Sequence, residues 1–298
     1  MNVEEQLEWE RRWALPAAAS AAAAGVLLIA YVAVGAASPH PTVDELTSQL
    51  LFFDRHGGNV IMSSVLLSLG WAAAALPLLY LYQATKLRRP ELPAAARATA
   101  LFGSVAVAVF GIAQQIALNA QAHDFATHGA QTFEQAKHAL QATGLQIVQS
   151  LNFAGQLALG FGLVMIALNA MRVGLLTRFM GIVGIICGVV TGLAQLFGQP
   201  PVLQAFWLLA LAYLVSGRWP NGVPPAWRSG KAEPWPTQQE LREARERAAG
   251  AETANAETAA AERVRDAEPE PAPEPATAGA SGGRSHSSSK KRKRKRRR

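Results

Sequence analysis

The chain has 298 residues, of which 50% are hydrophobic and 16% are charged. Because soluble proteins carry about 25% charged residues, this composition excludes a wholly disordered chain and favours a large apolar body. One cysteine excludes an internal disulfide framework and a cysteine-rich zinc module. The 28 Lys and Arg residues exceed the 21 Asp and Glu residues, which gives a net charge of +7. A basic protein of this kind commonly contacts a polyanion such as nucleic acid.

Six long apolar runs follow one another between residues 14 and 217. A bilayer core about 30 Å thick requires about 20 helical residues to cross it. Runs that are solidly apolar rather than alternating favour helices over the strands of a barrel. We therefore predict an all-α membrane protein with a six-transmembrane-helix bundle over residues 14–217. The runs are residues 14–36, 60–82, 99–119, 146–171, 179–197 and 202–217.

Basic residues mark one side of the predicted membrane. The segment 1–13 has two Lys or Arg residues, the second connection four and the fourth two, whereas the first and third have one each and the fifth none. Because Lys and Arg gather on the cytoplasmic side, both termini are predicted to be cytoplasmic. The Ala-rich composition favours a bacterial plasma membrane. A cleaved signal peptide ending near Ala36 is the alternative for the first run, and four glutamates before it oppose that alternative.

Amide side chains interrupt the third and fourth runs. Three of them in the fourth run are spaced i, i+3 and i+7, so they share one helical face. Amides facing lipid would leave unsatisfied donors, so this face is predicted to turn inward and meet the third run. Interhelical hydrogen bonds and a polar pocket or path for a small solute are the two interpretations. The candidate face comprises Gln114, Gln115, Asn119, Gln149, Asn152 and Gln156.

Glycines recur at four-residue spacing in the fifth run. Gly184, Gly188 and Gly192 lie on one helical face, and small residues at this spacing let another helix approach closely. Helix packing within the chain is the simpler interpretation. A homodimer face, and hence a homo-oligomer, is the alternative.

Asp, Glu, Lys, Arg and His are missing from all six runs. Proton relays, ion-coupled pumps and voltage sensors depend on such groups within the membrane. Nucleophile–base and metal-ligand motifs that would support catalysis are likewise missing from the runs. We therefore expect no catalytic residue, no metal and no cofactor.

The first and third connections are long enough to fold over the outer side. Apolar residues at helical spacing around Leu46 and Leu50, and around Phe133 and Leu140, predict short amphipathic segments on the membrane surface. Five histidines also lie in these connections. A metal site formed by His123, His128, His138 and Glu134 is conceivable. Their spacing matches no known ligand pattern, so we predict that they are solvated loop residues.

The composition changes after residue 217. Residues 218–236 are rich in Pro and Trp, and Trp219, Trp227 and Trp235 are expected to fold this segment back onto the inner membrane interface. Residues 237–266 are rich in Ala, Glu and Arg, with Thr237 and Glu240 forming a capping box, and predict an exposed helix. Residues 267–298 are predicted to be a disordered tail.

Nine consecutive basic residues end the sequence. Anionic lipid headgroups are the favoured partner, because each basic charge near a membrane surface contributes about 1 kcal/mol of binding. Nucleic acid or the ribosome is the alternative partner, since counterion release needs no sequence readout, and a third interpretation gives the cluster no specific partner. The cluster is Lys290, Lys291, Arg292, Lys293, Arg294, Lys295, Arg296, Arg297 and Arg298.

Two segments of the sequence resemble a family of membrane proteins. They are MRVGLLTRFMGIVGIICGV at residues 171–189 and PPVLQAFWLLALAYLVSGRWPNGVPPAW at residues 200–227. Together they resemble an uncharacterised family of actinobacterial multi-pass membrane proteins. The resemblance implies a bacterial plasma membrane location, and it brings no catalytic or binding residue with it.

The sequence thus predicts an integral plasma membrane protein without an enzymatic site. A structural or interaction protein whose tail contacts a polyanion is the first hypothesis. A small-solute transporter or channel that uses the amide face is the alternative. An enzyme with its site in the outer connections is the third.

Overall fold

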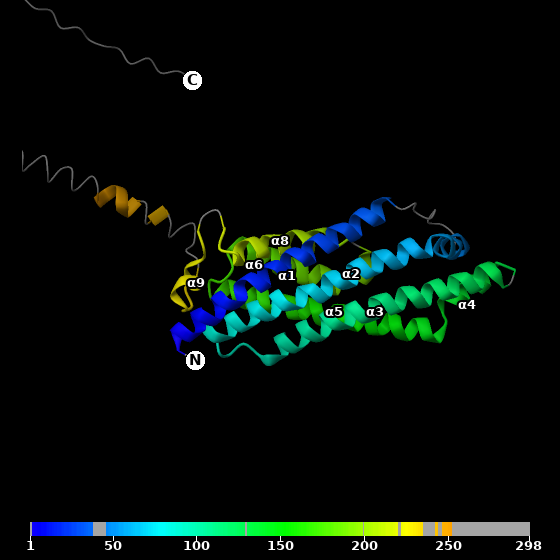
Figure 1. Ribbon diagram of the computed structural model, residues 1–298, viewed down its shortest axis with the longest axis horizontal. Helices are drawn as coiled ribbons and strands as arrows, with labels where there is room; N and C mark the ends of the chain where they lie inside the picture. Colours follow the sequence, from blue (N-terminus) through cyan, green and yellow to red (C-terminus); the bar gives the residue numbers. More distant parts are fainter. Residues whose placement is uncertain are drawn as a thin grey trace, which may run out of the picture. The chain divides into compact units, whose positions relative to one another are not determined.

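The computed structural model describes residues 2–37, 46–128, 130–198, 200–219, 222–234, 242–243 and 246–251. It divides into two units, Met1–Pro236 and Thr237–Arg298. In the second unit, residues 242–243 and 246–251 are helical, and Arg247 lies 3.6 Å from Glu243. The helices of the first unit are α1 (Val3–Ala37), α2 (Leu46–Arg88), α3 (Ala94–Thr127), α4 (Phe133–Leu140), α5 (Thr143–Arg172), α6 (Arg178–Gly192), α7 (Ala194–Phe197), α8 (Val202–Val215) and α9 (Pro225–Ser229) (Figure 1).

Four of these helices are long and apolar enough to cross a membrane, namely α1, α2, α3 and α5. The apolar helices α6 and α8 are shorter, with 15 and 14 residues. At a rise of about 1.5 Å per residue, each of them alone extends about 22 Å, less than the roughly 30 Å of a bilayer core. The predicted all-helical fold with membrane-length apolar helices is confirmed, whereas the six predicted runs become four long helices and two short ones.

The long helices run antiparallel to their neighbours in sequence. Helices α1, α3 and α6 begin, and α2, α5 and α8 finish, at the end of the bundle where α9 lies (Figure 1). We call this the basic end, because it carries Arg88, Arg172, Arg178 and most other basic residues of the described bundle. The helix α4 lies at the opposite, far end. This alternation gathers the predicted cytoplasmic connections at one end.

Glycines bring the helices into close contact. A Cβ atom on Gly103 of α3 would lie 2.3 Å from the backbone nitrogen of Leu159 in α5. A Cβ atom on Gly188 of α6 would lie 2.7 Å from the carbonyl oxygen of Gly160 in α5. Backbones therefore meet directly at both crossings, which is the packing that small residues permit between apolar helices.

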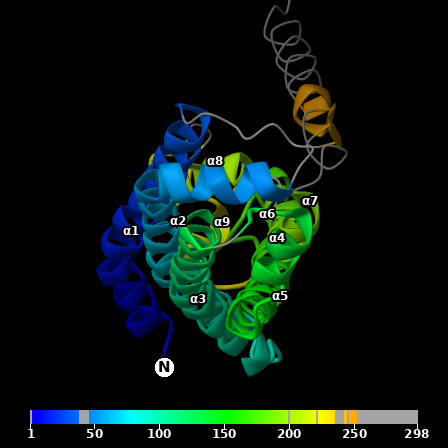
Figure 2. The same cartoon turned by 90° about the vertical axis from the view of Figure 1, so that its right-hand side faces the viewer.

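The far end differs from the prediction of surface-lying segments. Helix α2 begins at Leu46 and is kinked at His56, and its first turns cross the end of the bundle (Figure 2). Leu50 is fully buried against Phe125 of α3 and Ala136 of α4. The apolar face of this segment is thus covered by the protein itself, so the expectation that it lies on the membrane surface is wrong for Leu50. His40 lies outside the described residues.

Large apolar side chains cover the outside of the bundle. They are exposed on the two short helices as well as on the four long ones. An exposed apolar surface of this extent is unusual on a soluble protein and marks contact with lipid or another protein. Representative members are Leu15 and Val26 of α1, Met62 and Leu69 of α2, Phe102 and Val109 of α3, Leu157 and Phe161 of α5, Phe179 and Ile186 of α6, and Phe206 of α8.

The close crossing of α3 and α5 yields a test of the fold. We expect Gly103→Ala to destabilise the protein by about 1–3 kcal/mol, because the added methyl group must displace backbone of α5. Thermal unfolding in detergent measures this as a lower melting temperature. The control Gly35→Ala, in α1, adds a methyl group where nothing lies within 4 Å, so the melting temperature should not fall. Equal melting temperatures for the two variants would contradict the crossing.

Candidate functional site

Two of the predicted amides meet between α3 and α5. Asn152 of α5 is 7% exposed, and its Nδ2 donates a hydrogen bond of 2.8 Å to Oε1 of Gln114 in α3. The fourth predicted run thus contacts the third through an amide pair. The spacing of the amides on one helical face predicts this contact. A buried amide pair of this kind joins two helices and contributes about 0.6 kcal/mol.

The other predicted amides divide into buried and exposed groups. Gln149 is exposed, so the prediction that it faces inward is wrong. Its turn of α5 lies beyond the end of α6, because Gly192 of α6 packs beside Gly160 of α5 and leaves the earlier turns of α5 uncovered. Gln115 and Asn119 are half-buried, and the carbonyl oxygen of each is buried without a hydrogen bond among the described residues.

Gln156 lies in a different setting from Asn152. It lines a cavity of about 190 Å³ to which seven helices, α1, α2, α3, α5, α6, α7 and α8, contribute residues. We call this the amide cavity, because three glutamines, Gln156 of α5, Gln195 of α7 and Gln204 of α8, line it. Tyr31 of α1, Trp71 of α2 and Thr191 of α6 complete its polar and aromatic lining.

Two carbonyl oxygens at the amide cavity have no donor among the described residues. Gln204 is 4% exposed, and its Nε2 donates a hydrogen bond of 3.1 Å to Oγ1 of Thr191. The hydroxyl of Thr191 in turn donates to the carbonyl oxygen of Cys187 at 2.7 Å. This chain fixes the Gln204 amide and leaves its Oε1 buried and unpaired, as is Oε1 of Gln156. A buried acceptor without a donor costs about 1–3 kcal/mol and requires an explanation.

The amide cavity is chemically an acceptor site. Carboxamide oxygens accept hydrogen bonds and carry no net charge. They suit a molecule that presents N–H or O–H groups, and the rings of Tyr31 and Trp71 offer apolar faces beside them. At roughly 30 Å³ per water molecule, the volume corresponds to about six waters. The site therefore fits water or a small polar solute, and it is too small for a drug-sized ligand.

Two of the three glutamines of this cavity are not predicted from the sequence. Gln195 and Gln204 are isolated amides inside apolar runs. Neither shares a helical face with a second amide, so spacing gives no signal that they face a common site. Their convergence with Gln156 depends on how α5, α7 and α8 pack.

The predicted glycine face is used within the chain. Cβ atoms on Gly184 and Gly188 would lie 2.8 Å from Cβ of Ala167 and 2.6 Å from Cγ2 of Val164, both in α5. Gly184 also faces the indole of Trp207 in α8. Since α5 and α8 cover this face, a homodimer would need another surface.

Two histidines of the far end lie beside aspartates. His123 Nδ1 lies 2.9 Å from Asp54, and His128 Nδ1 lies 3.3 Å from Asp124. Within the described part of the chain, no group of three or more His, Cys, Asp or Glu residues gathers around a common point. His138 and Glu134 of α4 stand apart from these pairs.

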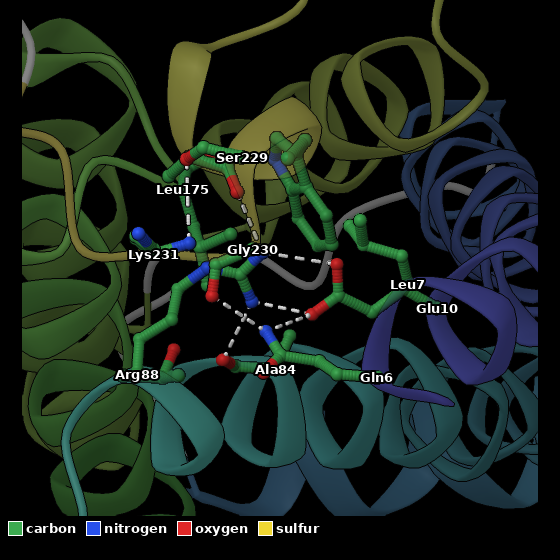
Figure 3. Close-up of polar contacts among 12 residues, drawn as sticks. Gln6, Leu7, Glu10, Ala84, Arg88, Leu175, Ser229, Gly230 and Lys231 are labelled. Carbon is green, nitrogen blue, oxygen red and sulfur yellow. Dashed lines mark hydrogen bonds and ion pairs between the residues drawn. The ribbon is translucent and has the colours of Figure 1, made fainter. Parts of the chain in front are cut away.

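A buried ion pair joins α1 to α2 at the basic end (Figure 3). The Arg88 side chain is fully buried and the Glu10 side chain is 4% exposed. Both Arg88 terminal nitrogens donate to the Glu10 carboxylate, one of them at 3.0 Å. Gln6 Nε2 donates to the same carboxylate at 3.2 Å and to the carbonyl oxygen of Gly230 at 3.0 Å. Arg88 also donates to the carbonyl oxygen of Ala226 at 2.6 Å.

Residues 222–234, which we call the strap, fold back onto this ion pair. The Trp227 ring stacks on Tyr80 with centroids 5.6 Å apart, and Trp9 stacks on Tyr80 at the same separation. Trp227 Nε1 donates to the carbonyl oxygen of Leu175, and the Glu233 amide donates to that of Val173. The Trp/Pro-rich segment thus docks on the bundle through Trp227, and its position at the inner membrane interface stays a prediction. Trp235 lies outside the described residues.

The ion pair could not be found from the sequence. Glu10 is one of four glutamates in the segment 1–13, and Arg88 is one of four basic residues in the second connection. Both precede or follow the apolar runs and resemble solvated flanking residues. Their burial depends on the strap, which is distant in sequence.

The polybasic cluster Lys290–Arg298 and the capping box at Thr237 and Glu240 lie outside the described residues. Comparisons of the chain with family models, curated proteins and solved structures find no match. The resemblance carried by residues 171–189 and 200–227 therefore stays a prediction.

The buried ion pair provides the second test. We expect Glu10→Gln to destabilise the protein by about 3–5 kcal/mol, because Arg88 then remains buried without a counter-charge. Melting temperatures in detergent report the change. The exposed neighbour Glu8→Gln removes the same charge and should have little effect. A Glu10→Gln/Arg88→Met double variant should recover much of the loss. Equal stability of the two single variants would refute the pair.

Proposed function

We propose that this chain is a multi-pass membrane protein that binds a small uncharged solute in the amide cavity and lets it cross the membrane. Four membrane-length apolar helices establish the membrane-like character. Exposed apolar side chains on α6 and α8, and the alternating direction of six helices, support six crossings. Helices α6 and α7 together cover residues 178–197, a length that approaches the roughly 30 Å bilayer core.

The unpaired oxygens of Gln156 and Gln204 carry the functional proposal. Packing alone would favour apolar side chains at these positions, because an unpaired buried acceptor is destabilising. Neither oxygen is exposed to the cavity in the structure, so a solute with hydrogen-bond donors would satisfy them after a small rotation of the two amides. The six apolar runs hold no charged side chain, which favours movement down the solute's own gradient over ion-coupled pumping.

The basic end supports a cytoplasmic position for both termini. Arg11, Arg12, Arg88, Arg172 and Arg178 lie at this end of the bundle, and the positive-inside rule assigns it to the cytoplasm. We propose a bacterial plasma membrane as the location, on the Ala-rich composition and on the resemblance described above. The amide cavity then lies nearer the outer side, since Gly198 and Pro201, in the turn after α7, line it.

Solute flux tests this function. Full-length protein in liposomes should raise the permeability to urea or glycerol, measured by stopped-flow light scattering. We expect Gln156→Leu/Gln204→Leu to lower the protein-dependent permeability about thirtyfold, because two acceptors of about 1 kcal/mol each are lost. Gln149→Leu, an exposed amide on the same helix, is the matched control and should keep the flux. Unchanged flux in a folded double variant would reject the proposal.

A second proposed function concerns the tail, and the run of nine basic residues favours it. We propose that this cluster contacts a polyanion, with anionic lipid preferred. Replacing all nine by Ser in the full chain, held in neutral nanodiscs, should abolish binding to anionic vesicles at low salt, since each charge contributes about 1 kcal/mol. Wild-type protein that binds RNA but not the vesicles would point to nucleic acid. Equal vesicle binding by both chains would reject the tail as the contact.

A further inference from the structure

A second cavity lies at the basic end, beside the buried ion pair. Its volume is about 320 Å³, and α1, α2, α8 and the strap line it. Glu10 lies in its wall, but the charge of Glu10 is already matched by Arg88. The cavity is distinct from the amide cavity, with which it shares no lining residue.

Two arginines give this cavity a positive rim. Arg11 of α1 and Arg228 of the strap line it, and both are exposed. Arg11 Nε donates to the carbonyl oxygen of Leu7 at 3.3 Å, which ties the guanidinium to its own helix. Within the described residues neither arginine is in an ion pair. The rim thus carries two positive charges, and its one carboxylate is neutralised.

The floor of the cavity is apolar. Leu214 and Val215 of α8 and Val223 of the strap line it. An apolar floor beneath a cationic rim, at the level where charged residues give way to apolar helix, matches the two parts of a lipid molecule.

We propose that this cavity binds an anionic phospholipid, with the phosphate held by Arg11 and Arg228 and an acyl chain on the apolar floor. A soluble anion would leave the apolar floor exposed to water. The bound lipid connects α1 to the strap, so it holds in place the segment from which the tail continues.

Lipid retention by the full chain tests this proposal. Protein purified with phosphatidylglycerol is washed in about 1 M NaCl, where the Debye length of about 3 Å screens loose contacts of the tail. Native mass spectrometry then counts the bound lipid. We expect Arg11→Gln/Arg228→Gln to lower retention about tenfold, since two charges at the headgroup are lost. Phosphatidylcholine should be retained less than phosphatidylglycerol by the wild type.

The control removes the same charges from the same segments. Arg12→Gln/Lys231→Gln alters exposed neighbours that do not line the cavity, and retention should match the wild type. Both double variants should keep the wild-type melting temperature, because all four side chains are exposed. Equal retention by the two double variants would overturn the site. Displacement of the lipid by inorganic phosphate would also overturn it, since that result would indicate a simple anion site. Neither outcome bears on solute flux through the amide cavity.

Discussion

Polar groups that leave water must find partners within the protein, and this constraint accounts for most of the structure. The backbone satisfies it by forming helices. The side-chain nitrogen of Asn152 satisfies it through Gln114, and the indole nitrogen of Trp207 through the carbonyl oxygen of Met180 at 2.9 Å. At the basic end the same constraint draws a distant segment onto the bundle, since Arg88 needs both Glu10 and the carbonyl oxygen of Ala226. The strap is therefore part of the bundle rather than the start of a tail.

Two cavities in the bundle can hold a ligand, and they place different polar groups beside it. Oε1 of Gln156 and of Gln204 lacks a donor, while the neighbouring Thr191 is fully paired through Gln204 and Cys187. At the basic end, Glu10 is matched but Arg11 and Arg228 are not in ion pairs within the described chain. The two sites differ in chemistry accordingly. One offers neutral acceptors between helices, and the other offers cations above an apolar floor.

Sequence predicts the helices well because long apolar runs without charges admit few other structures in lipid. The spacing of the amides in the fourth run predicts the inward turn of Asn152 and also, wrongly, that of Gln149. The exposure of Gln149 could not be predicted, because it depends on where α6 ends beside α5, and helix ends are set by the turn at Leu193 and by Pro200 and Pro201. The Glu10–Arg88 pair could not be predicted either, because its burial requires residues about 140 positions further along the chain.

Whether water reaches the amide cavity can be measured without knowing the solute. In a chain whose one cysteine, the fully buried Cys187, is replaced by Ala, a cysteine is placed at Gln204 or, one turn along α8, at Leu208, which is 2% exposed. A small hydrophilic thiol reagent is applied to the protein in liposomes. We expect Gln204→Cys to react readily and Leu208→Cys to stay unmodified. If Gln204→Cys were as inert as Leu208→Cys, the cavity would be a sealed interface and the proposed function would be contradicted.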